Sequence, residues 1–353
     1  MSFPPPKFTF TIPSIYDKTQ LDCRIFLPRE LSRLEPSSTW CRRGAIVAHP
    51  YAPLGGCYDD PVVGFVSEEL LKAGYIVGTF NFRGAGDSDG RTSWTAKPEL
   101  ADYVSIYCFL LYFLRILETG GPEEKLQGSS INQPLQTDIK SETEDPSKGI
   151  KIILGGYSYG SLIASHLPTI DVITNLFKKV RVGSALYEIC SIADKISVQW
   201  RKTFRKQMGI EIPRDSDSFH NDGHGNPLTK DFLTPISTSY LLVSPILPPI
   251  SQFLTVFSTM SLNVGSETSA QGKHIPCPKP TDQLRAHRTL ALYGNQDTFT
   301  SARKLQKWSE ELARGLDSNF RYREIDKAGH FWREDGVEVQ ARSALRDWLH
   351  LGE

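Results

Sequence analysis

A serine between two glycines is the residue in this sequence best placed to do chemistry. Ser158 lies in the pentapeptide 156–160, Gly-Tyr-Ser-Tyr-Gly, shortly after the apolar run Ile152–Leu154. Such a run predicts a buried strand, and glycine permits a turn too tight for residues with a Cβ atom. A helix is predicted directly after it. We therefore expect Ser158 to stand on a sharp strand-to-helix turn as a nucleophile, with a structural serine in a tight turn as the alternative.

A serine hydroxyl is a poor nucleophile at neutral pH and needs a base, which in turn needs a carboxylate to orient it. Asp297 follows the predicted strand 289–293, and His330 follows the predicted strand 320–325. Serine, acid and histidine in this chain order form one of the known arrangements of such a triad. For Asp297 the alternative is a simple turn former, since turn residues surround it.

The other histidines are weaker candidates for the base. His49 precedes a proline at the end of a predicted strand, where it either shapes a loop or lines the substrate pocket. His166 lies on the helix that follows Ser158, where a structural role is expected. The remaining histidines fall in polar segments or at the C-terminus: His220, His224, His274, His287 and His350.

An oxyanion formed during acyl transfer needs two backbone N–H donors. One should come from Tyr159, the residue directly after the nucleophile, and the other from the loop that begins at His49. The prolines of that loop have no N–H to donate. Tyr51 is therefore the predicted second donor, with Ala52 as the alternative.

Predicted strands and helices alternate along the chain. The strands are expected at 8–12, 21–27, 45–48, 75–82, 152–154, 240–243, 289–293 and 320–325. The helices are expected at 62–72, 99–117, 161–167, 302–314 and 337–349. This alternation favours an α/β fold with a mostly parallel central sheet flanked by helices.

Two insertions interrupt this core, which we assign to residues 1–169 and 239–353. The polar composition of 119–149 predicts a disordered surface insertion. Residues 170–238 carry apolar side chains at helical spacing and predict a helical lid, with a plain packing helix as the alternative. On that block, Trp200 and Phe204 are predicted to line a partly apolar substrate pocket, or else to bury against the body. Residues 262–282 are polar and are predicted to be mobile.

Composition excludes several classes of protein. Forty basic and forty acidic residues give a net charge of zero, so neither nucleic acid nor an anionic membrane is expected as a partner. The N-terminus does not resemble a secretory signal, and the longest apolar run is shorter than the ~20 residues of a membrane span. The six cysteines lack CxxC or metal-type spacing. We expect a cytoplasmic protein with reduced thiols, no metal, no cofactor and a small-molecule acyl substrate.

Five segments of the sequence resemble the α/β-hydrolase superfamily. They are HPYAPLGGCYDDPVV (49–63), FNFRGAGDSDG (80–90), GGYSYGS (155–161), YGNQD (293–297) and AGHFW (328–332). Within the superfamily, they resemble a branch of small predicted hydrolases with an HPxPxxGG-like loop and an NFRGxGxSxG turn. The resemblance implies an α/β-hydrolase fold with Ser158 as nucleophile, Asp297 as orienting acid and His330 as base. It also implies an oxyanion hole at Tyr51 and Tyr159.

The function implied by this resemblance is a serine hydrolase that cleaves a carboxylic ester or thioester through an acyl-enzyme. Two alternatives stay open. The same fold hosts lyases, cyclases and isomerases that use the triad for acid–base chemistry, and it can also serve as a non-catalytic ligand-binding protein. Small members of the branch lack the 119–149 and 170–238 insertions, so their substrates do not transfer to this chain.

Overall fold

A computed structural model describes residues 4–32, 40–118, 149–178, 180–207, 234–255, 260–265 and 273–351. The insertion predicted at 119–149 lies outside these residues apart from Gly149. Residues 208–233 of the predicted lid lie outside them as well.

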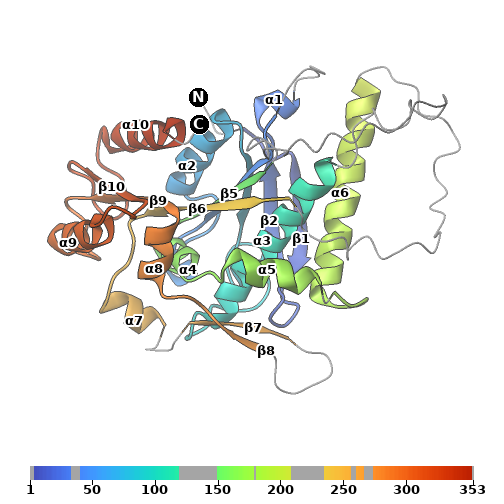
Figure 1. Cartoon of the computed structure of the whole chain (residues 1–353), viewed down its shortest axis with the longest axis horizontal. Helices are drawn as coiled ribbons and strands as arrows, with labels where there is room; N and C mark the ends of the chain where they lie inside the picture. Colours follow the sequence, from blue (N-terminus) through green and yellow to red (C-terminus); the bar gives the residue numbers. More distant parts are fainter. Residues whose placement is uncertain are drawn as a thin grey trace, which may run out of the picture.

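The core is an eight-stranded sheet (Figure 1). In spatial order its strands are β1 (Phe8–Pro13), β2 (Gln20–Phe26), β4 (Ile76–Phe80), β3 (Arg43–Ala48), β5 (Ile150–Tyr157), β6 (Ile236–Val243), β9 (Arg288–Gly294) and β10 (Phe320–Ile325). The six strands from β4 to β10 in this order are parallel, whereas β2 runs antiparallel to both of its neighbours. The mostly parallel sheet predicted from the sequence is confirmed.

Alternation along the strands divides the core between the two faces of the sheet. In β3, Ile46 belongs to one buried cluster and Val47 to the other. In β6, Leu242 and Leu241 divide in the same way. Successive side chains of a strand point to opposite faces, so a strand buried on both faces must be apolar at every position. This is why the central strands read as continuous apolar runs in the sequence.

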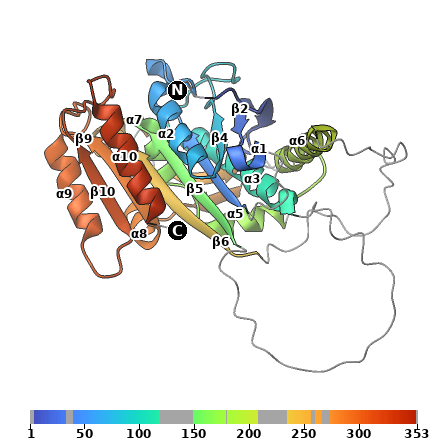
Figure 2. The same cartoon turned by 90° about the horizontal axis from the view of Figure 1, so that it is seen from above.

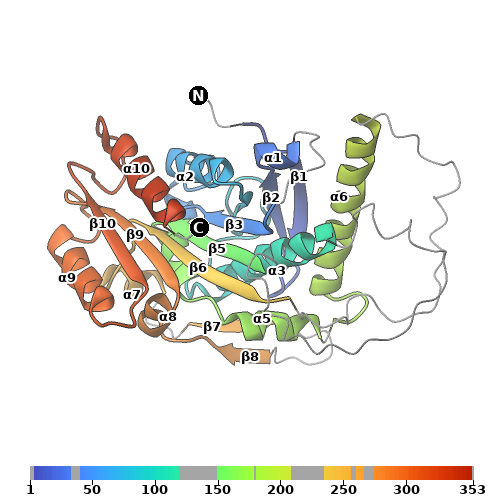
Figure 3. The same ribbon diagram turned by 45° about the horizontal axis from the view of Figure 1, so that its top comes forward.

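Helices cover both faces of the sheet (Figures 2 and 3). On one face lie α2 (Pro61–Lys72) and α10 (Val337–His350). On the other lie α3 (Lys97–Glu118), α4 (Tyr159–Ser165), α8 (Pro280–Ala286) and α9 (Ala302–Ala313). The α3 helix is long and apolar enough to cross a membrane by composition, but 83% of that stretch is buried inside the fold. It is the central helix of the core.

The described part of the predicted lid packs against the body. It contains α5 (Ile170–Phe177) and α6 (Ala185–Gln207), and α6 lies along α3 and β1. The buried residues of α6 recur at helical spacing: Leu186, Ile189, Cys190, Ala193, Ile196 and Ser197. Figure 1 shows α6 at the end of the molecule opposite α9 and β10. Residues 185–207 thus behave as the packing helix that was the alternative to a lid.

The segment after β6 is more structured than its sequence predicts. It holds α7 (Ile250–Leu254) and an antiparallel pair, β7 (Ser261–Val264) with β8 (Lys273–Pro276). The sequence predicted only a polar, mobile segment over 262–282 and did not predict these strands or α8. Strands of four residues are too short for a periodic signal to distinguish them from loop.

Candidate active site

Ser158 occupies a strained turn between β5 and α4. Its backbone angles are φ 54° and ψ −113°, a conformation that residues with a Cβ atom adopt only at a cost. The flanking glycines are required by close packing. A Cβ atom on Gly156 would lie 2.3 Å from the carbonyl carbon of Gly160, and one on Gly160 would lie 2.4 Å from the carbonyl oxygen of Ala48. Glycine at both positions lets the start of α4 approach β5 and β3. This close approach presents Ser158 at the carboxyl end of the central strand β5.

The three residues predicted to form a triad lie in hydrogen-bonding contact. The Oγ atom of Ser158 is 2.9 Å from Nε2 of His330, and Nδ1 of His330 is 2.8 Å from Oδ2 of Asp297. Ser158 follows β5, Asp297 follows β9 and His330 follows β10. These strands are parallel, so their carboxyl ends lie at the same end of the sheet. Only 4–6% of each residue is exposed to solvent. Since a carboxylate can only accept, Nδ1 donates to Asp297, and the lone pair of Nε2 faces the serine hydroxyl.

The Asp297 carboxylate is fixed by its own loop. Its Oδ1 atom accepts backbone N–H bonds from Phe299 at 2.8 Å and Thr300 at 3.0 Å, which leaves Oδ2 for the imidazole. Asn295 joins this loop to the histidine loop, because its side chain donates to Asp326 and accepts from the N–H of Lys327. Asn295 thus connects the two loops that carry the acid and the base.

Aromatic side chains surround the His330 ring. The ring of Phe299 stacks on it with centroids 4.1 Å apart and planes 21° apart, and Phe331 meets it edge-on at 5.6 Å. The hydroxyl of Tyr157 donates to the backbone carbonyl of His330 at 2.7 Å. Sequence reasoning missed Phe299, and the only available signal was its position two residues after the acid.

Tyr51 and Tyr159 lie together near Ser158. Tyr51 precedes the short helix η1 (Ala52–Leu54), Tyr159 is the first residue of α4, and their ring centroids are 5.1 Å apart. Within the part of the chain that the structure describes, neither backbone N–H donates a hydrogen bond. Both donors are therefore free for a ligand oxygen.

His49 belongs to the scaffold and not to a pocket. It is 0% exposed, its Nδ1 atom lies 2.6 Å from the carbonyl oxygen of Pro50, and its Nε2 atom accepts the N–H of Phe82 at 2.9 Å. Burial lowers its pKa to about 4, so the ring is neutral at pH 7. The predicted pocket role of His49 is replaced by its loop-shaping alternative, since both ring nitrogens are occupied by backbone.

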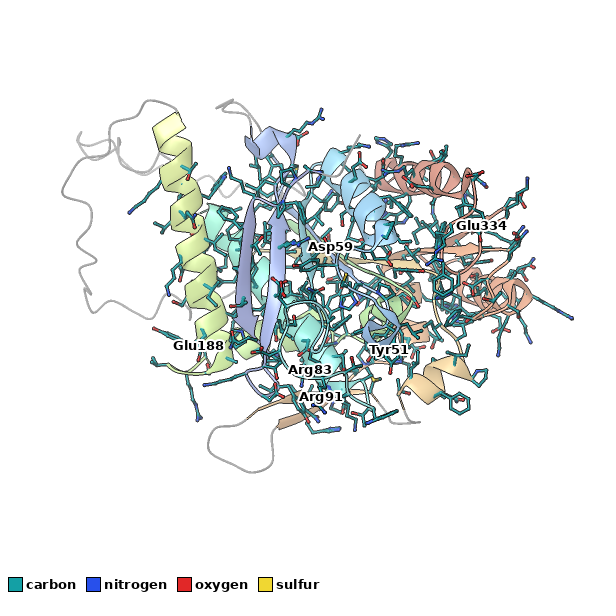
Figure 4. The ribbon with its side chains drawn as sticks, turned by 180° about the vertical axis from the view of Figure 1, so that it is seen from behind. Tyr51, Asp59, Arg83, Arg91, Glu188 and Glu334 are labelled. Atoms are coloured by element: carbon teal, nitrogen blue, oxygen red, sulfur yellow. The ribbon has the colours of Figure 1, made fainter. Side chains whose placement is uncertain are left out.

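The pocket roles predicted for Trp200 and Phe204 are not supported by the placement of α6. Trp200 lies on that helix, which packs on α3 and β1, and the side chain of Phe204 lies outside the described residues. In Figure 4, Glu188 of α6 and Glu334 of the histidine loop lie at opposite ends of the molecule, with Tyr51 between them. A packing helix at that end does not cover the serine.

The turn after β4 is held in place by polar contacts within the scaffold. Arg83 is buried against α3, where its guanidinium meets the Asp102 carboxylate at 2.7 and 2.9 Å and also contacts Asp17. Ser88 binds the carbonyl oxygen of Asn81 within the same turn. Among the described residues, no cluster of three or more histidine, cysteine, aspartate or glutamate side chains could hold a metal ion.

Comparison with solved structures gives several matches over nearly the whole chain. An α/β serine hydrolase homologue from Coxiella burnetii is 15% identical, with 98% of this chain and 99% of that chain covered and a TM-score of 0.48. An α/β serine hydrolase without lid from Xanthomonas campestris is 14% identical, with 100% and 97% covered and a TM-score of 0.49. Est1E from Butyrivibrio proteoclasticus, solved with ferulic acid bound, is 12% identical, with 97% and 98% covered and a TM-score of 0.47. No family model and no curated protein matches the sequence.

The fold assignment follows from the structure of the chain. The sheet is mostly parallel and covered by helices on both faces, and a serine stands on a strained strand-to-helix turn after β5. An acid and a histidine follow at later strand ends, in the order expected of this architecture. The chain therefore has the fold of the α/β-hydrolase superfamily.

Proposed function

We propose that this chain is a cytoplasmic serine hydrolase that cleaves a small carboxylic ester or thioester. The observation that carries the proposal is the unbroken hydrogen-bonded series from Ser158 through His330 to Asp297, at 2.9 and 2.8 Å. A base within this distance of a serine hydroxyl, itself oriented by a carboxylate, is what activates a serine as a nucleophile.

In the proposed mechanism, His330 takes the hydroxyl proton as Ser158 attacks the acyl carbon. Negative charge on the acyl oxygen is stabilised by the N–H groups of Tyr51 and Tyr159. His330 then gives its proton to the departing alcohol or thiol, which leaves the acyl group on the serine. A water molecule, deprotonated by His330, attacks this acyl-enzyme; the bond to Ser158 breaks, the proton on His330 returns to the serine oxygen, and the carboxylic acid is released. No cofactor enters any step.

One observation favours a second candidate. Ser158 and His330 are only 5% and 4% exposed, and limited access of water to the site would suit a lyase, cyclase or isomerase that uses the same residues for proton transfer. Such an enzyme would form no acyl-enzyme, because the serine would carry a proton and not an acyl group.

The test is the mass of the intact protein after incubation with a fluorophosphonate and, separately, with an activated ester. We expect a single phosphonyl adduct on the wild type and none on Ser158→Ala. Rapid quenching of the ester reaction should trap a single acyl adduct on the same residue.

A matched control is Ser161→Ala, which removes a buried hydroxyl one turn along α4 that donates to the carbonyl oxygen of Ser158. It should keep the phosphonyl adduct. A folded wild type that takes the phosphonyl group but never an acyl group would favour the second candidate. A wild type that takes neither would leave a non-catalytic ligand-binding protein as the better interpretation.

A further inference from the structure

A pocket of about 640 Å³ lies beside α4, on the face that also carries α8 and α9. This volume is in the range of small-molecule sites. The pocket is walled by α4, the end of β6, the segment leading into α7, and the helices α8 and α9. Its apolar lining includes Leu162, Ile246, Leu247, Leu284 and Trp308.

The pocket begins one helical turn from the candidate nucleophile. Its α4 wall includes Ser161, Leu162 and Ser165, which follow Ser158 at steps of three, four and seven residues. Residues at these steps share one face of a helix. The Ser161 hydroxyl of this wall donates to the carbonyl oxygen of Ser158 at 2.7 Å, so the wall contacts the backbone of the nucleophile.

A second wall is joined to the acid of the triad. The N–H of Leu247 in the pocket wall donates to Oγ1 of Thr300 at 3.3 Å. The N–H of Thr300 in turn donates to Oδ1 of Asp297 at 3.0 Å. The segment that forms this wall is thus hydrogen-bonded to the loop that carries the acid of the triad.

The direction of the pocket distinguishes the two halves of an ester. The leaving oxygen must lie within reach of Nε2 of His330, because it takes the proton from that atom. The described lining includes α4 residues just after the nucleophile, but neither Ser158 itself nor any residue of the loop that carries His330. A substrate group in this pocket would therefore be the acyl chain and not the alcohol or thiol.

The chemistry of the lining selects an uncharged chain. Lys304 and Lys307 lie at the rim with Glu311, and the Nζ atom of Lys304 already binds the carbonyl oxygen of Pro248. Lys307 and Glu311 are 4.0 Å apart and exposed, a geometry that contributes little binding energy in water. Burial lowers the pKa of His166 in the wall, so this ring is neutral at pH 7. Removal of apolar surface from water is the main attraction left.

We infer that this pocket holds the acyl chain of the substrate, and that the preferred substrates are esters or thioesters of medium-length aliphatic carboxylic acids. This inference rests on the proposed function and names its substrate class. It requires that catalytic efficiency rise with chain length until the pocket is filled.

The experiment compares p-nitrophenyl acetate, butanoate and octanoate as substrates of the wild type and of Leu247→Trp and Thr281→Trp, which fill the pocket from two walls. We expect kcat/KM of the wild type to rise from acetate to octanoate. Each variant should lower kcat/KM for octanoate by about tenfold and leave acetate within about twofold. The control is Asp282→Trp, which changes the exposed neighbour of Thr281 outside the lining and should keep the preference for octanoate.

A wild type that cleaves acetate as efficiently as octanoate overturns the inference, and so do pocket variants that lower both rates equally. Failure of the proposed function would look different, because no ester would react and Ser158 would take no phosphonyl group. In that case calorimetric titration with octanoate tests the pocket directly. Binding by the wild type that is lost in Leu247→Trp supports it as a site for an aliphatic acid chain, and no binding overturns it.

Discussion

At the scale of single residues, the orientation of His330 is determined by several contacts at once. Asp297 holds Nδ1, the Tyr157 hydroxyl holds the backbone carbonyl, and Phe299 stacks on the ring face. Asp297 is itself held by two backbone N–H groups of its loop. A base held in this way loses little freedom when the substrate binds, which favours catalysis by positioning.

Phe299 is predicted to be a positioning residue for this base. Replacing it with leucine keeps an apolar cover but removes the stacked ring. We expect kcat to fall by about three- to tenfold, since aromatic pairs contribute about 0.5–1.5 kcal/mol. KM should change little, because Phe299 acts through His330. Steady-state kinetics with one activated ester measures both constants.

Two further variants separate positioning by Phe299 from simple packing. Phe299→Tyr keeps the stacked ring and should retain most of the wild-type kcat. Phe331→Ala removes the edge-on ring, which is 51% exposed, and should lower kcat less than the leucine variant. Equal losses of kcat in Phe299→Leu and Phe299→Tyr would contradict the prediction.

At the scale of elements, the serine turn depends on how closely α4 approaches two strands. The hydroxyl is presented because β5 ends in a strained residue and α4 begins at once. That geometry requires backbone contact between the start of α4 and the ends of β5 and β3, which side chains at the flanking positions would prevent.

Gly160→Ala should therefore damage both stability and activity. Its Cβ atom would lie 2.4 Å from the backbone oxygen of Ala48, which cannot move without displacing β3. We expect the free energy of unfolding to fall by about 3 kcal/mol. Urea denaturation measures this change, and labelling by the fluorophosphonate should decrease in the fraction that still folds.

The matched control is Gly64→Ala, a glycine within α2 where an added Cβ atom meets nothing within 4 Å. Alanine has the higher helix propensity, so this variant should gain up to about 1 kcal/mol of stability. Similar effects of the two substitutions would show that close packing is not the reason for glycine at position 160.

At the scale of the whole molecule, stability should depend on pH through a buried histidine. His49 connects the end of β3 to the residues after β4 and is neutral in the folded protein, where burial lowers its pKa to about 4. In the unfolded chain its pKa is near 6.5. The unfolded chain therefore takes up the proton first as the pH falls. The contribution of the neutral His49 ring to the stability of the folded protein is complete above pH 6.5 and is lost between pH 6.5 and 4.

His49→Gln removes this titration while retaining a donor and an acceptor. Between pH 7 and 4.5 the wild type should lose about 2 kcal/mol more stability than the variant. Urea denaturation at the two pH values measures the difference. Burial also lowers the pKa of His166 and His287, but these residues are present in both proteins and cancel in the comparison. The same pH dependence in both proteins would contradict the prediction.

The sequence by itself determined the class of fold and the candidate residues of the triad. Both follow from local order: apolar runs predict the strands, glycine spacing predicts the turn at Ser158, and chain order selects Asp297 and His330. A local pattern needs more residues than a short strand contains. The sequence therefore could not resolve β7 and β8, which are four residues long each.

Only the tertiary structure decided what surrounds these residues. It placed Phe299 on the His330 ring, occupied both nitrogens of His49, and packed α6 on α3 and β1 away from the serine. It also formed a pocket from four segments that lie far apart in the chain. These contacts join residues distant in sequence, and a local pattern contains no information on which distant surface an apolar side chain will meet.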